Sequence, residues 1–232
     1  MTVRFRKIDD QNRGHHSYLT ADDECLFLLE YTSGQDYSSS ATNSLISNLK
    51  KKPSLAGTGQ YRYKLETIHA CGVALGEAIT PKWLAVGTLV PVPPSKVRGD
   101  PEYDDRILKI CQAIPAARAV DIREIVIQTR SLPAAHESGQ RPTIDDLLAV
   151  YRIDESKAAP APKSIAIVRR RAHERDPFPR DENNPGAVLP GGADLRLLYC
   201  PPRVSEPLRG IAAFLMAAPF NDRCETARPE LG

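Results

Sequence analysis

Long apolar runs and a strong excess of one charge are both missing from this sequence. Among its 232 residues, 31 Lys and Arg nearly balance 29 Asp and Glu, which leaves a formal net charge of +2. No apolar run is long enough to span a bilayer, and the stretch from Met1 to Arg13 lacks the apolar segment of a signal peptide. These absences argue against a membrane protein and against nucleic-acid binding through overall charge. We therefore expect a soluble, cytoplasmic protein.

Cysteine is also scarce, and its spacing follows no metal-binding or disulfide pattern. The five cysteines are Cys25, Cys71, Cys111, Cys200 and Cys224. Their number is odd, they lie far apart, and no C-x-x-C pair or set of neighbouring histidine ligands accompanies them. The sequence therefore predicts neither a disulfide framework nor a zinc site, and it favours a reducing compartment.

Short apolar runs alternate with helical patterns along most of the chain. Residues 1–20 show no periodicity, so we expect them to be disordered. Strands are predicted at Cys25–Leu29, Leu84–Val90, Ile122–Ile127 and Ser164–Val168. This alternation predicts an α/β domain over residues 21–168, with three layers and a mostly parallel sheet that has helices on its faces.

Three helices are expected between these strands. The first follows the cap candidates Ser38 to Ser40, the second is about 16 residues long and stops at Pro81, and the third starts near Tyr103–Arg106. The apolar stripe of the second helix comprises Leu65, Ile68, Gly72, Leu75 and Ile79. A further short helix is expected after Thr143, with Leu147, Leu148 and Tyr151 packed inward.

The junction after Val90 is the first place where the residues favour chemistry. The predicted strand runs into prolines and then offers Pro94, the Ser95 hydroxyl and the Lys96 ammonium. Such a loop at the carboxyl edge of a sheet is typical of a rigid anion site. A rigid surface loop without a ligand is the alternative interpretation.

The order of these motifs resembles that of the type I phosphoribosyltransferases, and among them the competence-type amidophosphoribosyltransferase-like proteins. The matching segments are Leu89–Lys96, Tyr103–Arg106, Ile125–Arg141 and Ser164–Val168. The resemblance implies that Pro94, Ser95 and Lys96 hold the pyrophosphate of phosphoribosyl pyrophosphate. It also implies a loop after Val168, two acids followed by Thr-Thr-Gly or Thr-Ser-Gly, that wraps the 5-phosphate and ribose.

The reaction that the resemblance implies is a Mg²⁺-assisted displacement of pyrophosphate by a nitrogen nucleophile or an analogue. The polar loop from Thr129 to Pro142 is where we expect an acceptor or a mobile hood to act. Its candidate residues are Arg130, His136 and Arg141. The alternative interpretation is that these side chains are only solvated. The acceptor substrate is not specified by any motif.

The chain departs from the family pattern at the position of the acidic loop. There it has Arg169, Arg170, Arg171, Ala172, His173, Glu174 and Arg175. Carboxylates at this point would accept hydrogen bonds from the ribose hydroxyls and offset the charge of a forming oxocarbenium ion, and guanidinium groups would oppose both. The sequence therefore predicts a protein that is inactive as a phosphoribosyltransferase.

A one-base shift in the reading frame accounts for this departure. Arg169 to Arg175 can be encoded as CGA CGA CGT GCT CAC GAG CGG, and reading one base later, with the first base of the Asp176 codon, gives DDVLTSG. Only the middle base of each shifted codon is free. In the same frame, Asp176 to Pro185 gives THFRAMKTIL, a plausible helix start, and Tyr199 to Val204 gives IARRVF, which resembles a late family strand.

The composition of the tail supports the same hypothesis. Lys163 is the last lysine, and every strongly basic residue after it is arginine. Nine prolines follow: Pro177, Pro179, Pro185, Pro190, Pro201, Pro202, Pro207, Pro219 and Pro229. We interpret residues 169–232 as a poorly ordered, out-of-frame tail. Because this tail replaces the later strands of the family, we expect an exposed sheet edge and poor solubility.

Three functions from different classes follow from these observations. The first is a phosphoribosyltransferase by descent that has lost its substrate loop. The second is a non-catalytic module that binds a phosphate or nucleotide and still uses Pro94, Ser95 and Lys96. The third, which the interleaved acids and missing aromatic residues oppose, is a nucleic-acid-binding protein with an arginine-rich tail.

Overall fold

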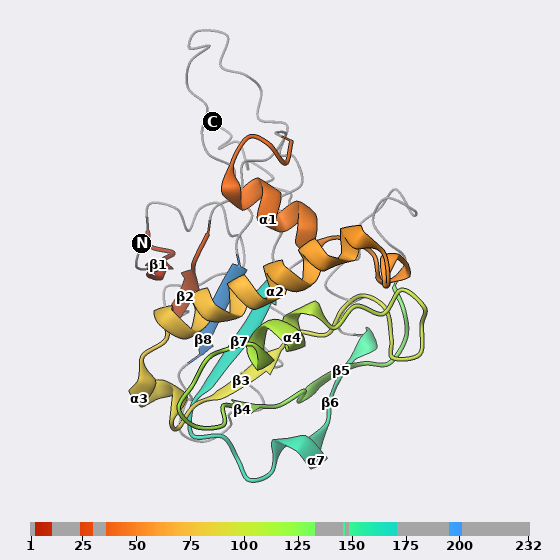
Figure 1. Ribbon diagram of the computed structural model, residues 1–232. Coiled ribbons are helices and arrows are strands. Elements are labelled where there is room, and N and C mark those ends of the chain that lie inside the picture. The colour runs from red at the N-terminus through yellow and green to blue at the C-terminus, as the bar shows by residue number, and fades with distance from the viewer. Residues whose placement is uncertain are drawn as a thin grey trace, which may run out of the picture.

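The computed structural model describes residues 3–10, 24–29, 36–132, 146, 149–170 and 195–200. They form a mixed α/β structure with a six-stranded main sheet (Figure 1). In spatial order its strands are β1 (Arg6–Lys7), β2 (Glu24–Phe27), β8 (Leu195–Cys200), β7 (Ile165–Arg170), β3 (Thr88–Pro91) and β4 (Asp121–Ile122). A second sheet pairs β5 (Val126–Gln128) with β6 (Tyr151–Ile153).

Three strands of the main sheet are parallel. Strand β3 lies between β4 and β7 and is parallel to both, with Thr88 opposite Asp121 on one side and Ile165 on the other. The remaining neighbours, β7–β8, β8–β2 and β2–β1, pair antiparallel. The expectation of a mostly parallel sheet is therefore right for the β4–β3–β7 part only.

The buried strands β3 and β7 alternate between two apolar layers. Leu89, Ala166 and Val168 face one core cluster, whereas Val90 and Ile167 face the other. All five side chains are fully buried. Burial on both faces explains why Ser164–Val168 reads as a continuous apolar run, as expected for a strand inside a parallel sheet.

Helices cover one face of the main sheet. Figure 1 shows α1 (Ala41–Leu49), α2 (Gly59–Ala78) and α4 (Arg106–Gln112) on the same side of it. Their buried residues form a core with the sheet residues Leu89, Ala166 and Val168: Leu49, Ile68, Cys71, Leu75, Ile110 and Cys111. The opposite face packs instead against Ile125, against Val126 in β5 and against Ala158 in the short helix α7 (Glu155–Ala158).

Several expected elements have different bounds in the structure. The run Leu84–Val90 forms a strand only from Thr88, because Leu84 ends the short helix α3 (Pro81–Leu84) and Val86 is 57 % exposed. The run Ile122–Ile127 is divided between two sheets, β4 and β5. Tyr151 lies in β6, not in a helix, while Thr143, Leu147 and Leu148 fall outside the described residues.

Two described segments lie in regions for which we expected disorder. In the first, Ile8 is 2 % exposed and donates its backbone N–H to the carbonyl of Cys25 at 2.9 Å. In the second, β8 pairs with both β2 and β7, so that β7 is not an edge strand. Both segments therefore belong to the main sheet.

Candidate functional site

The carboxyl ends of β3 and β7 lie side by side. Pro91 is opposite Val168, and the backbone N–H of Val92 donates to the Val168 carbonyl at 2.9 Å. Beyond this point β3 continues into the loop with Pro94, Ser95 and Lys96. In open α/β sheets, ligands bind beyond such strand ends. The two segments that the resemblance assigns to pyrophosphate and to the ribose phosphate therefore start at adjacent positions.

The expected loop position after Val168 is only partly described. Arg169 and Arg170 extend β7 and pair with β8 opposite Arg196 and Leu195. Residues 171–175 fall outside the described part of the chain. The described guanidinium-bearing residues thus occupy strand positions, and they do not fit the ligation of a cation.

The loop after β3 is held by hydrogen bonds to the segment that follows β5. The carbonyl of Ser95 accepts from Gln128 Nε2 at 2.6 Å and from the backbone N–H of Leu132 at 2.8 Å. The N–H of Val97 donates to Ser131 Oγ at 3.1 Å. This loop is therefore anchored at several points, as the proline content indicated.

Lys96 lies near a carboxylate of the same loop. The pKa of Asp100 is lowered chiefly by the backbone N–H of Glu102, then by the Ser131 hydroxyl, and also by the charge of Lys96. Ser131 donates to Asp100 Oδ2 at 2.9 Å. An anion that binds Lys96 must therefore compete with Asp100 for its charge.

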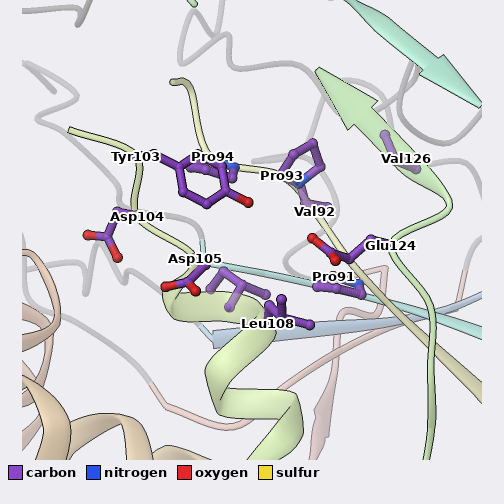
Figure 2. Close-up of a pocket in the computed structure, with 11 residues that line it drawn as sticks. Pro91, Val92, Pro93, Pro94, Tyr103, Asp104, Asp105, Leu108, Glu124 and Val126 are labelled. Carbon is purple, nitrogen blue, oxygen red and sulfur yellow. The ribbon is translucent and has the colours of Figure 1, made fainter. Parts of the chain in front are cut away.

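A small recess opens at the carboxyl end of β3 (Figure 2). Its walls come from the proline segment, the start of α4 and the approach to β5. They are lined by Pro91, Val92, Pro93, Pro94, Tyr103, Asp104, Asp105, Ile107, Leu108, Glu124 and Val126. Of the three residues predicted for the pyrophosphate, Pro94 is part of this lining and Ser95 and Lys96 are not.

The carboxylates around the recess already have cationic partners. Glu124 accepts two hydrogen bonds from Arg98 Nη2, at 2.5 and 2.6 Å, and Asp105 pairs with Lys109 at 2.8 Å. In Figure 2 the hydroxyl of Tyr103 and the carboxylate of Glu124 point into the recess. Because this lining carries carboxylates and no cation, the recess itself is unsuited to a phosphate.

A buried group of charges stands behind this wall. Lys64 of α2 is 1 % exposed and contacts Asp104 Oδ2 at 2.5 Å, and the same oxygen contacts Arg106 Nη2. Burial lowers the pKa of the Lys64 ammonium, although its hydrogen bond to Asp104 opposes this shift. In Figure 2 the Asp104 carboxylate points away from the recess. Sequence reasoning missed this group because Lys64 lies next to Leu65, which appeared to belong to the apolar stripe.

The candidate hood residues are described in part. Arg130 is exposed after β5, and its carbonyl accepts from Gln128 Nε2 at 2.8 Å. His136 and Arg141 fall outside the described residues. The Gln128 amide thus bonds to the carbonyls of both Arg130 and Ser95, and Arg130 is not among the residues that line the recess.

The described residues show neither a metal-binding cluster nor a membrane-spanning helix. The described part of the chain contains no group of three or more His, Cys, Asp or Glu side chains that could hold a metal ion. No described side chain is therefore assigned as a ligand of Mg²⁺. No helix in the described ranges combines the length and apolar character needed to cross a membrane.

Comparison of the chain with protein-family models, with curated proteins and with solved structures found no match.

Proposed function

We propose that this chain is a phosphoribosyltransferase-type domain that binds a phosphorylated small molecule beyond β3 and β7 and does not transfer a phosphoribosyl group in its present form. The observation that carries the proposal is the parallel register of these strands, with Pro91 opposite Val168. Because of this register, the loop that contains Ser95 and Lys96 and the segment that follows β7 both begin at the same edge of the sheet.

The loop after β3 supplies the chemistry for an anion. Lys96 carries a positive charge, Ser95 offers a hydroxyl, and prolines at positions 91, 93 and 94 limit the conformations of the backbone. A loop that is ordered before the ligand arrives loses less entropy on binding. These properties support pyrophosphate or a nucleotide phosphate as the ligand.

The lack of transfer follows from the charge at the end of β7. Arg169 and Arg170 stand where the resemblance requires acids. Positive charge at this point destabilises an oxocarbenium-like transition state, so the chain binds the ligand but does not catalyse the transfer. The second candidate function is a non-catalytic binding module, which the loop of Ser95 and Lys96 also favours. The two candidates differ in whether restoring the acidic loop restores phosphoribosyl transfer.

Calorimetric titration tests the proposal. The ligands are phosphoribosyl pyrophosphate with Mg²⁺ and inorganic pyrophosphate, and the proteins are this chain and a version in which the one-base shift restores DDVLTSG after Val168. We expect pyrophosphate to bind both chains, phosphoribosyl pyrophosphate to bind the restored chain more tightly, and pyrophosphate release with a nitrogen acceptor only from the restored chain. Equal binding of phosphoribosyl pyrophosphate by both would contradict the role of the acidic loop.

A lysine variant locates the binding. Lys96→Met removes the loop charge and should weaken pyrophosphate binding by about tenfold, the effect of losing one charge-assisted hydrogen bond. Lys82→Met is the matched control, because Lys82 is exposed in α3 outside this loop. Equal affinity of Lys96→Met and wild type would exclude this loop. Salt-dependent retention of a single-stranded DNA oligonucleotide without pyrophosphate binding would favour the arginine-rich nucleic-acid function instead.

A further inference from the structure

Lys64 occupies a position in α2 where an apolar residue is expected. The buried face of this helix consists of Lys64, Thr67, Ile68, Cys71, Gly72 and Leu75. Its neighbour Leu65 is 50 % exposed. The chain thus places the charged side chain in the core and the leucine in solvent. Positions that break the packing rules in this way are often those at which a protein gives up stability for function.

The contacts of Lys64 join three segments of the chain. Its Nζ lies 2.5 Å from Asp104 Oδ2 and donates to the backbone carbonyl of Lys51, also at 2.5 Å. Asp104 precedes α4, and Lys51 follows α1. The ammonium group therefore connects the ends of α1 and α4 through α2.

Both oxygens of Asp104 are engaged. Oδ2 contacts Lys64 and Arg106 Nη2, and Oδ1 accepts from the backbone N–H of Arg106 at 3.2 Å. The side chain of Asp104 is 6 % exposed and that of Arg106 is 20 % exposed. These contacts fix the carboxylate on the side of α2, where it points away from the recess, although Asp104 is one of the lining residues (Figure 2).

Stability alone does not account for this arrangement. Two cations share one buried carboxylate, and the desolvation of such groups often cancels their attraction. A Met or Leu at position 64 would bury apolar surface without that cost. Directional contacts, in contrast, specify one orientation of the residues that they join.

We infer that Lys64 is a positioning residue of the candidate site, which holds Asp104 out of the recess and thereby sets the place of Tyr103 in its wall. The inference rests on the proposed function insofar as the recess adjoins the ligand loop. Without the Lys64 ammonium, Asp104 retains only Arg106, and its carboxylate gains freedom to turn toward the recess and toward a bound anion. Lys64 itself does not line the recess.

The test compares Lys64→Met with Arg62→Met. Both changes remove one positive charge from the same turn of α2, but Arg62 is exposed and pairs only with Glu66, at 3.1 Å, among the ion pairs of the described residues. Urea unfolding monitors the fold. The resonance of ¹³C-labelled Tyr103, assigned with Tyr103→Phe, reports the wall without any ligand, and calorimetry with inorganic pyrophosphate reports binding.

We expect Lys64→Met to unfold cooperatively, to shift the Tyr103 resonance, and to bind pyrophosphate about tenfold more weakly. Arg62→Met should match wild type in all three measurements. A folded Lys64→Met protein with an unchanged Tyr103 resonance would overturn the inference. If the wild-type chain does not bind pyrophosphate, the proposed function fails, and the Tyr103 resonance alone still decides the role of Lys64.

A second variant covers the case in which Lys64→Met does not fold. Asp104→Asn keeps the shape of the side chain and removes its charge, so it should also shift the Tyr103 resonance. Where Lys64→Met does fold, the double variant should show a shift smaller than the sum of the two single shifts, because the two residues act through one contact. Additive shifts, or no shift in folded Asp104→Asn, would contradict the positioning role.

Discussion

Gly72 allows α2 and α4 to approach each other closely. A Cβ atom at this position would lie 2.6 Å from the Cβ of Ala113 and 2.8 Å from the carbonyl oxygen of Ile110. Both neighbours belong to a rigid helix end, so a side chain could be accommodated only by separating the helices. We expect Gly72→Ala to lower the free energy of unfolding by about 1–3 kcal/mol, measured by urea denaturation.

Gly59 provides the control for this substitution. It lies at the start of the same helix, and a Cβ there would have no atom within 4 Å. Gly59→Ala should leave stability unchanged or raise it by up to about 1 kcal/mol, because alanine has the higher helix propensity. If Gly72→Ala behaved like Gly59→Ala, the close approach of the helices would be disproved.

At the scale of single residues, the sequence predicted apolar burial better than charged burial. Ile68, Gly72 and Leu75 were expected on the inner stripe of α2 and are buried there, and Ile79 is buried directly after the end of the helix. The prediction for Leu65 was wrong, because the buried face of α2 is rotated toward Lys64. A hydrophobic pattern contains no sign that a lysine will be neutralised by Asp104, which lies 40 positions away in the chain. Such long-range pairing is visible only in the folded structure.

At the scale of elements, β3 and β4 are joined by a side-chain contact as well as by backbone hydrogen bonds. Thr88 Oγ1 lies 2.7 Å from Asp121 Oδ2, and Arg123 Nη2 contacts the same carboxylate at 2.8 Å. Arg123 Nη1 also donates to the Pro160 carbonyl at 2.7 Å. The carboxylate thus connects two strands and, through Arg123, the turn that precedes β7.

This contact predicts a specific acid sensitivity. The Arg123 hydrogen bond, followed by that of Thr88, holds the pKa of Asp121 below its ordinary value. A carboxyl group with a lowered folded-state pKa stabilises the fold above its unfolded pKa, and this contribution is lost as pH falls through the folded-state pKa. We expect urea midpoints of wild type to fall from about pH 5 to pH 3 more steeply than those of Asp121→Asn.

The control for the pH experiment is Glu77→Gln. Glu77 lies on the exposed side of α2, and its substitution changes the net charge by the same amount as Asp121→Asn. A wild-type pH profile that coincides with the Asp121→Asn profile would exclude Asp121 as the source of the acid sensitivity.

Elements were predictable where burial is uniform and unpredictable where the chain changes sheets. The apolar run of β7 and the cap of α1 are confirmed; Ser40 Oγ accepts from the N–H of Asn43 at 3.0 Å. The run from Ile122 to Ile127 gave no sign that it would leave the main sheet after Ile122. Both of its parts are apolar because each packs against a core, so the pattern is the same whether one sheet or two contain it.

At the scale of the whole molecule, β8 closes the side of β7 that would otherwise be an edge. Its backbone pairs with β7 from Ile165 to Arg170 and with β2 from Glu24 to Phe27. A chain that ends after Arg170 would expose both strands, and with them the buried Phe27 and Ile167. We expect this truncated chain to aggregate and to lose its cooperative thermal transition, while the full chain retains one.

Size-exclusion chromatography with light scattering measures this difference. The restored-frame chain is the informative comparison, because it differs from the full chain only after Val168. A monodisperse truncated chain with an unchanged melting transition would show that residues 171–232 contribute nothing to the fold, in agreement with our interpretation of them as an out-of-frame tail. The opposite result would assign a structural role to β8.

The candidate site was predictable as a location and less so as a set of residues. Strand ends and prolines indicated the carboxyl edge of β3, and the structure places a recess there. The lining also contains Tyr103, Asp105 and Glu124, which no motif had assigned to the site. Their approach depends on how α4 and the start of β5 fold back over the edge, which local sequence does not encode.

The order of strands in the main sheet also sets how long β2 must wait for its partner during synthesis. Strand β2 ends at Phe27, but its partner β8 begins at Leu195, which is 168 residues later. At about 5–20 residues per second, a ribosome needs roughly 10–30 s to cover this distance. During that interval β2 can pair only with β1, so the apolar side chains of Cys25 and Phe27 are not yet buried and can make non-native contacts. The first 30 residues are therefore made long before the main sheet can be completed.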